Sequence, residues 1–313
     1  MEKQTHHQKL HDLIGSLPQE SGFIKRMRFH QAWWRAFVLG EEQGKWPNSK
    51  DLEKRIGSTI PEGQESGKNF LTENTLAAVQ KTQLERKETE FGMMEPDRLF
   101  NNLLSSQPLC FNFFGELKLD LDLAAAVMGC FYPAVTRVTN VWFEFAPLAR
   151  YTQDNSAFDI AVELEIGDRK GLLGMECKFT EPFSQKEYDK PAYREIFQKS
   201  DVFKEEYATY ISSRYNQLFR NQLMAEAVVQ NGDYEFVHTG LFCHQEDQNA
   251  TRIGAEFADL LDLEENFQVI TFRDFMERVQ QLPLSWEQRD WSNLLWARYC
   301  STRLSESLIE ELR

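Results

Sequence analysis

Three side chains in neighbouring segments have the types and spacing that metal-dependent phosphodiester hydrolysis requires. Glu176 and Lys178 are two residues apart in GMECKFTE, and Asp159 lies upstream in AFDIAVE. Side chains of a β-strand alternate between its faces, so Glu176 and Lys178 share a face if GMECKFTE is a strand. Two carboxylates suit Mg²⁺, which keeps part of its hydration shell and bridges to a phosphate. A lysine beside them can lower the pKa of an attacking water or hold the phosphate charge.

A hairpin would bring these three side chains together. The segment 167–170, Gly-Asp-Arg-Lys, is typical of a tight turn between two strands. A tip at residues 168–169 sets Asp159 opposite Lys178 and makes Asp159 and Glu176 diagonal neighbours. Directly opposed residues point to the same face of a sheet, so the two carboxylates and the ammonium are expected to converge.

Two other Glu-x-Lys tripeptides compete with this interpretation. Glu85-Arg86-Lys87 lies in a polar helical run with no strand around it. Glu116-Leu117-Lys118 lies in the alternating segment ELKLDLDL, with Asp97 upstream. No hairpin links Asp97 to that tripeptide, and LKLDLDLAAAVM is better interpreted as the opening of a helix. Composition alone leaves both a structural salt bridge and a catalytic site open for the group around Lys178.

The hydrophobic period indicates which elements must position these residues. Alternating, β-branched and aromatic runs predict strands over 136–147, 156–167, 170–181, 234–243 and 267–272. Helical spacing predicts helices over 31–39, 51–57, 123–132, 205–230 and 272–313, and a polar helix that ends near Gly92. The order of helix, three strands, helix and further strands is typical of an α/β core with helices on its faces.

The net charge of −14, from 35 basic and 49 acidic residues, argues against a polycation that coats nucleic acid. Residues 23–55 are an exception, with eight basic and four acidic side chains. Arg26 and Arg28 there are interleaved with aromatic residues. This stretch is either a phosphate-contacting element or an amphipathic helix whose tryptophans face the core, and we favour the helix.

Length and residue usage narrow the class of protein further. A chain of 313 residues is expected to have one core of roughly 150–200 residues with helical additions. Five dispersed cysteines without a CxxC pair predict free thiols in a reducing compartment. No apolar run approaches the ~20 residues of a membrane span, and the N-terminus lacks an apolar signal segment. We therefore expect a cytoplasmic protein that does not insert into a membrane.

Five ordered segments resemble the PD-(D/E)xK nucleases, the restriction-endonuclease-like superfamily. AFDIAVE and MECKFTE match its two core motifs, with Asp159, Glu176 and Lys178 at the motif positions. A family of bacterial restriction endonucleases within it is similar over residues 69–245. That similarity runs through RLFNNLLSSQPLCFNFFG, VWFEFAP, AFDIAVE, MECKFTE and YNQLFRNQLMAEA. The ordered set of five segments is far more specific than the short core pattern alone.

The resemblance implies a role for each matched core residue. The metal ligands would be Asp159, Glu176 and the backbone carbonyl of Cys177. Lys178 would position or activate the attacking water. Mg²⁺ is the implied cofactor, and Mn²⁺ would substitute for it.

Three further residues match the family outside the core motifs. Glu144 corresponds to an upstream acidic residue of the site, and its alternative interpretation is a solvated charge on a strand. Gln217 and Arg220 correspond to a Gln-x-x-Arg pair on the following helix, where the alternative is a polar helix face. The chain departs from the family in that same helix. Asn221-Gln222 stands where relatives have an acidic residue and a histidine.

The expected protein is thus a metal-dependent endodeoxyribonuclease that hydrolyses DNA phosphodiester bonds and leaves 5′-phosphate and 3′-hydroxyl ends. Its partner would be DNA, with no membrane, and a homodimer is an open option. Two other functions stay open. One is a catalytically inactive DNA-binding or interaction protein that keeps the nuclease fold. The other is a repair-type nuclease that acts on RNA or branched DNA.

The expected fold is α/β, with a restriction-endonuclease-like core in which a mixed central sheet is flanked by helices. Residues 1–96 would form a helical N-terminal extension that could contact DNA. Residues 97–275 would form the nuclease core, and residues 276–313 a helical C-terminal segment.

Overall fold

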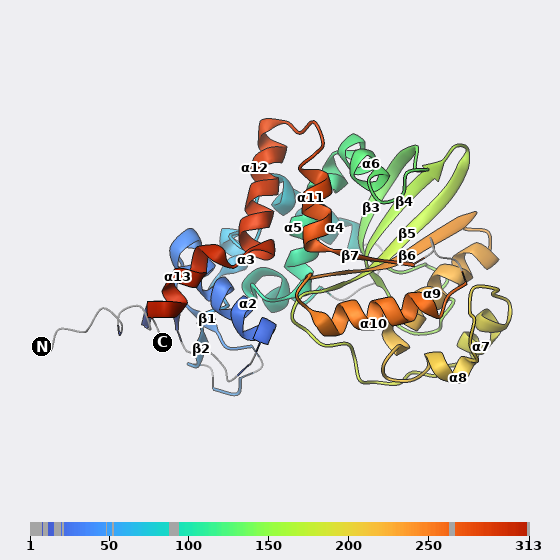
Figure 1. Cartoon of the computed structure of the whole chain (residues 1–313), viewed down its shortest axis with the longest axis horizontal. Helices are drawn as coiled ribbons and strands as arrows, with labels where there is room; N and C mark the ends of the chain where they lie inside the picture. The colour runs from blue at the N-terminus through green and yellow to red at the C-terminus, as the bar shows by residue number, and fades with distance from the viewer. Residues whose placement is uncertain are drawn as a thin grey trace, which may run out of the picture.

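A five-stranded mixed sheet forms the centre of the computed structural model (Figure 1). The structure describes residues 8, 12–15, 20, 22–47, 49–51, 53–87, 94–262 and 267–311. In chain order the elements are α2 (Gly22–Trp33), the π-helical turn η1 (Trp34–Leu39), β1 (Gly44–Lys45), β2 (Arg55–Ile56), α3 (Gly63–Ser66), α4 (Glu73–Lys87), the π-helical turn η2 (Asp97–Asn101), α5 (Ser106–Leu119), α6 (Leu121–Gly129), β3 (Arg137–Phe145), β4 (Phe158–Ile166), β5 (Arg169–Lys178), α7 (Pro191–Gln198), α8 (Tyr207–Tyr210), α9 (Asn216–Gln230), β6 (Phe236–Cys243), α10 (Gln248–Asp259), β7 (Phe267–Thr271), α11 (Phe272–Val279), α12 (Trp286–Leu295), the π-helical turn η3 (Trp296–Cys300) and α13 (Arg303–Glu311).

The strand order in the sheet is β3-β4-β5-β6-β7. The first three strands are antiparallel neighbours joined in sequence, whereas β6 and β7 each pair in parallel with the strand before them. Parallel neighbours need a crossover connection, and helices supply both crossovers. The α/β class and the mixed central sheet expected from the sequence are therefore confirmed, as are its five strands.

Helices cover both faces of this sheet (Figure 1). On one face, α5, α6 and α11 pack against the strands through a large core that includes Phe113, Val162 and Phe242. On the other, α9 and α10 pack through a separate core that includes Phe219 and Leu241. The sheet is thus held between two apolar layers, which fixes its strand ends in place.

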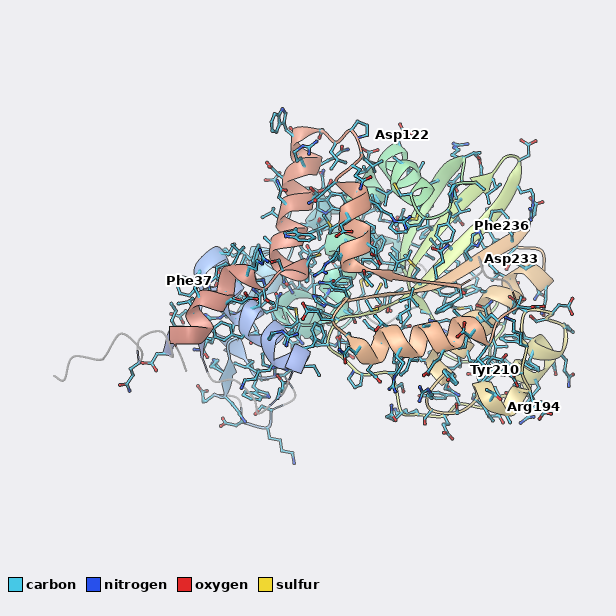
Figure 2. The ribbon with its side chains drawn as sticks, viewed as in Figure 1. Phe37, Asp122, Arg194, Tyr210, Asp233 and Phe236 are labelled. Carbon is cyan, nitrogen blue, oxygen red and sulfur yellow. The ribbon has the colours of Figure 1, made fainter. Side chains whose placement is uncertain are left out.

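Close packing between β5 and β6 requires a glycine. A Cβ on Gly171 would come within 2.2 Å of the ring of Phe236, its partner across the parallel pair (Figure 2). A larger residue at 171 would force the Phe236 ring to move. This glycine therefore leaves room for that ring over β5, the strand that carries Glu176 and Lys178.

The helices nearest to the two termini pack together beside the sheet. Helix α13 contacts α2, and the ring of His30 lies 2.9 Å from both Ser305 Oγ and the Ala297 carbonyl. The fully buried Arg298 donates to the backbone carbonyl and the side-chain oxygen of Asn69, at 2.7 and 2.6 Å. These long-range bonds join the N-terminal and C-terminal helical segments.

The basic stretch near the N-terminus forms the packed helix that we favoured from its sequence. Trp34 is 2% exposed. Arg28 donates to both carboxylate oxygens of Glu20, at 2.6 and 2.7 Å, and Arg26 pairs with Glu246. Both arginines already have carboxylate partners.

Three local predictions need correction. Residue 51 and residues 53–57 are not helical: Arg55–Ile56 pair with Gly44–Lys45, because about two turns of helix do not offset the nucleation cost. The helix predicted over 205–230 is interrupted after α8, where Asn216 Nδ2 donates to the Ile211 carbonyl at 3.0 Å. Helix α10, between β6 and β7, was not predicted.

The hairpin register also differs from the expected one. Ile166 pairs with Arg169, so Gly167 and Asp168 form the tip. Gly167 has φ +61°, a backbone conformation that glycine adopts readily. The register is shifted by two residues and the pairing ends at Ile160 with Met175, so Asp159 is not paired with Lys178. Because the shift is an even number of residues, each side chain of the hairpin stays on the face that was expected for it.

The described part of the chain contains no helix with both the length and the apolar character needed to cross a lipid bilayer. All five cysteines lie in that part, and each is a free thiol there.

Candidate active site

One cavity of about 520 Å³ is lined by all six side chains that the sequence analysis selected. Three strands and one helix supply them. Glu144 comes from the end of β3, Asp159 from the start of β4, and Glu176 and Lys178 from the end of β5. Gln217 and Arg220 come from the first turns of α9: the cavity walls thus include Glu144, Asp159, Glu176, Lys178, Gln217 and Arg220.

The carboxylate-bearing residues stand in register across the sheet. Phe143 pairs with Ile160 and Phe145 with Phe158, so Glu144 lies opposite Asp159. On the other side of β4, the last backbone pair is Ile160 with Met175, and beyond it the Asp159 side chain accepts the Cys177 backbone N–H. Three acidic residues therefore lie near the ends of three adjacent strands.

Asp159 lies at the centre of this row. Its Oδ2 accepts a hydrogen bond from the Cys177 backbone N–H at 2.7 Å. Burial raises the pKa of Asp159 well above its ordinary value, and the negative charges of Glu176 and Glu144 raise it further. This carboxyl is therefore under electrostatic stress that a bound cation would relieve.

Glu176 is 5% exposed and is held by donors on both oxygens. Gln217 Nε2 donates to Oε1 at 2.5 Å, and Asn221 Nδ2 donates to Oε2 at 3.0 Å. Lys178 Nζ also lies 3.0 Å from Oε1. A buried charge requires such partners, and these set the direction in which the carboxylate points.

Lys178 is charged in this setting. Burial opposes its charged form, but the carboxylates of Glu176 and Asp159 outweigh burial and raise the pKa of the ammonium. Its Nζ donates to Gln217 Oε1 at 3.1 Å. The Ser184 N–H donates to that same oxygen at 3.1 Å, which leaves Gln217 Nε2 directed at Glu176. Gln217 thus connects the two charged residues.

Glu144 has an unusual backbone conformation. Its φ of +51° lies in the left-handed region, which non-glycine residues seldom occupy within a strand. Gln107 Nε2, from the first turn of α5, donates to its Oε1 at 3.0 Å. Strained residues of this kind cluster at functional sites, where the surrounding structure holds them.

Arg220 is held in a second polar group at the far wall of the cavity. Its Nη1 lies 3.4 Å from Asp154 Oδ2 and 3.2 Å from Ser156 Oγ, and its guanidinium stacks over the Tyr188 ring. Burial disfavours the charged form of Asp154, but hydrogen bonds from Tyr193, Ser156 and Thr152 outweigh it and lower its pKa. Among the described residues, no group accepts a hydrogen bond from the buried Arg220 Nε.

The donor set fits a hard divalent cation. Three carboxylates line one open cavity, and carboxylate oxygens are the ligands that Mg²⁺ and Mn²⁺ prefer. Burial and the charges of Glu176 and Glu144 raise the pKa of Asp159, and a bound cation would counter both effects. Asp159 and Glu176 could therefore contribute ligands to such an ion.

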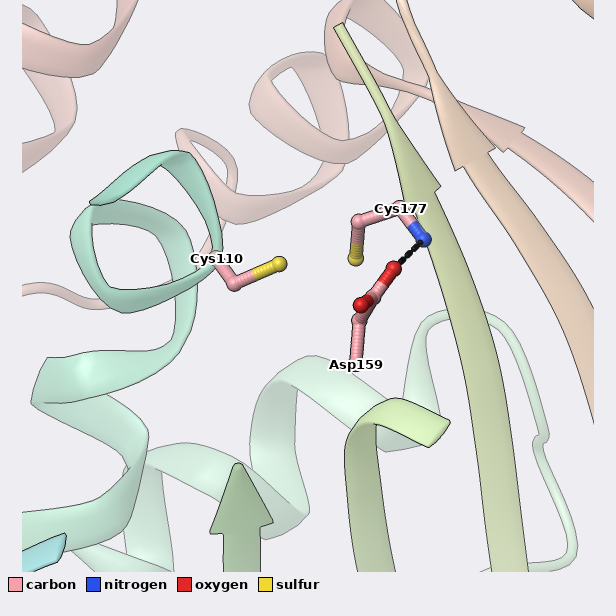
Figure 3. Close-up of side chains that lie close together, drawn as sticks. All are labelled: Cys110, Asp159 and Cys177. Atoms are coloured by element: carbon pink, nitrogen blue, oxygen red, sulfur yellow. Dashed lines mark hydrogen bonds between the residues drawn. The ribbon is translucent and has the colours of Figure 1, made fainter. Parts of the chain in front are cut away.

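Two thiols lie close to the carboxylate of Asp159. The sulfur atoms of Cys110 and Cys177 and an oxygen of Asp159 all lie within 4.8 Å of one another (Figure 3). Burial raises the pKa of Cys177 to about 11, so this thiol is protonated at neutral pH. Protonated sulfur is a poor ligand for a hard cation. These thiols are therefore apolar neighbours of Asp159.

The competing tripeptide has a structural role. Lys118 lies in helix α5, where its Nζ pairs with Glu85 at 2.9 Å and donates to the Val141 carbonyl at 2.9 Å. Glu116 accepts hydrogen bonds from Thr72 and Asn74. Neither Lys118 nor Glu116 lines the cavity. The tripeptide at 85–87 lies within helix α4.

Several residues at the site were not selected from the sequence as contributors. Asn221 contacts Glu176, Asp154 holds Arg220, and Glu181 lines the cavity with its Oε1 accepting the Ser106 N–H at 2.9 Å. Asn221 follows Gln217 by four residues, the spacing that places two side chains on one helix face. That spacing could have identified it. The others depend on long-range contacts.

The comparisons with known proteins agree with this architecture. The family model described as PD-(D/E)XK nuclease superfamily matches residues 18–301, which is most of the chain. Neither the search of curated proteins nor that of solved structures found a match. With its five-stranded mixed sheet flanked by helices, the chain belongs to the PD-(D/E)XK nuclease superfamily.

Proposed function

We propose that this protein is a metal-dependent endodeoxyribonuclease that acts as a restriction endonuclease. The observation that supports this most is that three carboxylates and a buried ammonium line one open cavity. The reaction is hydrolysis of a DNA phosphodiester. A water oxygen bonds to phosphorus, the bond to the 3′ oxygen breaks, and the products are a 5′-phosphate and a 3′-hydroxyl.

Asp159 and Glu176, with the backbone carbonyl of Cys177, would hold the divalent cation. When bound, Mg²⁺ or Mn²⁺ neutralises the carboxylates and polarises the phosphoryl oxygens. Lys178 has ammonium protons available to orient the attacking water and to stabilise charge on the phosphate. Gln217 fixes the direction of both Glu176 and Lys178 through its two amide atoms.

The charge of the cavity supports the proposal that a cation binds before DNA. Four basic and five acidic side chains line it: Arg98, Arg150, Lys178 and Arg220 against Glu144, Asp154, Asp159, Glu176 and Glu181. Phosphate groups would be repelled by the uncompensated carboxylates. A divalent ion reverses the sign of that balance and makes the cavity attractive to a polyanion.

Cleavage assays with purified protein test this function. Plasmid DNA, branched DNA and RNA are incubated with Mg²⁺ or Mn²⁺, and with a chelator as the metal-free control. We expect metal-dependent cleavage of duplex DNA. Cleavage of RNA or branched DNA alone would favour a repair-type nuclease instead.

The matched variants are Lys178→Ala and Lys186→Ala. Lys186 follows β5 by eight residues and is exposed. Lys178→Ala is expected to abolish cleavage and Lys186→Ala to retain it. Circular dichroism checks that both variants are folded, and Lys178→Met preserves the packing of the aliphatic stem if alanine disrupts it. Wild-type turnover by a folded Lys178 variant would contradict the assignment.

A further inference from the structure

Asn221 is in direct contact with Glu176, the more deeply buried of the two proposed metal-binding carboxylates. Its Nδ2 donates to Glu176 Oε2 at 3.0 Å, and the two residues are 7% and 5% exposed. Gln217, one turn earlier on α9, donates to the other oxygen. A pair of amides spaced by four residues thus holds both oxygens of one carboxylate.

Helix α9 gives these amides a rigid support. Leu218, Phe219 and Leu223 pack into the core shared with α10. Met224 and Ala225 pack into a second cluster against the sheet. All five side chains are at most 1% exposed. The helix cannot rotate without disrupting both clusters, so the position of the Asn221 amide is fixed.

The contacts on Glu176 leave room for a cation. An ionised carboxylate accepts at about four lone-pair positions on its two oxygens. Gln217 and Lys178 use positions on Oε1, and Asn221 uses one on Oε2. At least one lone pair of Oε2 is left, and the Asn221 bond determines the direction in which it points.

We propose that Asn221 is a positioning residue that holds Glu176 in its metal-binding orientation. This inference rests on the proposed function, because it requires a divalent cation at Glu176. Partners that orient a metal ligand typically change metal affinity by about 10- to 100-fold when they are removed. Asn221 would therefore set the metal concentration at which the site fills.

The amide group is essential to this role. An aspartate at 221 has nearly the same shape but donates no hydrogen bond when ionised. It would face Glu176 as a second carboxylate at the same short distance, and the two would repel. This chain thus uses an uncharged donor at a position where the resemblance to restriction endonucleases implies an acid.

Mn²⁺ binding tests the inference without any need for cleavage. Titration calorimetry with MnCl₂ is performed on the full-length wild type, Asn221→Leu and Asn221→Asp. Asn231→Ala is the matched control, since Asn231 follows the end of the same helix and is not among the residues that line the cavity. Melting curves with and without Mn²⁺ accompany each titration.

Asn221→Leu is expected to weaken Mn²⁺ binding about tenfold and to reduce the rise in melting temperature that the metal produces. Asn221→Asp is expected to melt below wild type without metal. It should then gain more from Mn²⁺ than wild type does, because the ion relieves a new repulsion. Asn231→Ala should respond as wild type does. A purely structural role for Asn221 predicts lower melting temperatures with an unchanged metal response in both variants.

Wild-type Mn²⁺ affinity in Asn221→Leu, with weakened affinity in Asp159→Asn, would overturn the inference and leave the proposed function standing. Absence of Mn²⁺ binding in wild type would overturn both. If Asn221→Leu does not fold, the near-isosteric Asn221→Asp decides the matter. A metal response equal to that of wild type in the aspartate variant would reject the positioning role.

Discussion

Glu144, Asp159 and Glu176 concentrate negative charge along one cavity, and Lys178 compensates only part of it. The consequence is greatest at Asp159. Burial and the two neighbouring carboxylates raise the pKa of this residue. The native state therefore binds a proton at this carboxyl more tightly than the unfolded chain does. At pH values at which Asp159 ionises, its ionisation lowers the stability of the metal-free protein.

We predict a pH dependence of stability that belongs to Asp159. A raised native pKa means that stability is lost as the pH rises from the ordinary aspartate range, near 4, through the raised value. Asp159→Asn cannot ionise, so its melting temperature should fall less over that window. Melting curves without metal at a series of pH values measure the difference. Parallel curves for the two proteins would show that Asp159 is not under electrostatic stress.

A second prediction at this scale concerns Lys118. Its side chain is fully buried, pairs with the partly exposed Glu85 and donates to the Val141 carbonyl, so Lys118→Ala removes both contacts. We expect a loss of about 2 kcal/mol in the free energy of unfolding, because the Val141 carbonyl loses its donor. Urea denaturation measures it, with the exposed Lys186→Ala as the control. A loss below about 0.5 kcal/mol would show that the pair contributes little.

Six residues that line the cavity could be named from the sequence, for two different reasons. Asp159, Glu176 and Lys178 follow from strand alternation and a hairpin, which are local patterns. Glu144, Gln217 and Arg220 are implied only by the resemblance to a nuclease family. The supports of these residues are not local. Asp154 and Gln107 reach the site from a loop and a helix whose approach depends on the whole fold.

Among the elements, the strands were the easiest to predict and their exact pairing the hardest. Alternation identifies a strand from its own residues, but the register of β4 with β5 depended on which residues form the turn. A shift by an even number of residues leaves each side chain on the same face of the sheet, so Asp159, Glu176 and Lys178 still line one cavity. Helix α10 was missed although Ile253 and Phe257 are buried at helical spacing.

The segment that follows β5 carries the next prediction. Glu181 accepts the Ser106 N–H at the start of α5, and Arg98 lies 3.6 Å from the same oxygen. All three residues line the cavity. Glu181→Gln removes one negative charge there and should raise the affinity for DNA. Arg98→Ala should lower it and reduce the salt dependence by about one unit of slope.

Fluorescence anisotropy in the Lys178→Ala background measures both effects, because the DNA then stays intact. Lys186→Ala in that background is the control for removal of a charge outside the cavity. An unchanged affinity in Glu181→Gln, or an unchanged salt slope in Arg98→Ala, would remove this segment from the DNA-binding surface.

At the scale of the whole molecule, helices α2 and α13 meet through buried polar groups. His30 lies between Ser305 and the Ala297 carbonyl, and burial lowers its pKa to about 4. No sequence pattern predicts such a contact, because the residues that form it are more than 260 positions apart in the chain. The structure alone shows that the N-terminal and C-terminal helices stabilise each other.

This contact predicts sensitivity to mild acid. The lowered pKa of His30 means that the unfolded chain takes up a proton first, so stability is lost as the pH falls from 6.5 towards 4. The difference between these values corresponds to roughly 3 kcal/mol. His30→Gln should reduce the slope of unfolding free energy against pH in this window. An identical slope in that variant would show that His30 is not the group that titrates.

The account as a whole depends on a divalent cation held between Asp159 and Glu176. The most direct measurement is a set of melting curves with and without millimolar Mg²⁺ or Mn²⁺ for wild type and Asp159→Asn, since it does not depend on the choice of a DNA sequence. We predict that metal raises the melting temperature of wild type, because the ion binds the native state and relieves the repulsion between carboxylates. Asp159→Asn should gain much less, and should be at least as stable as wild type without metal. An equal response to metal in both proteins, or no response in wild type, would contradict the proposed site.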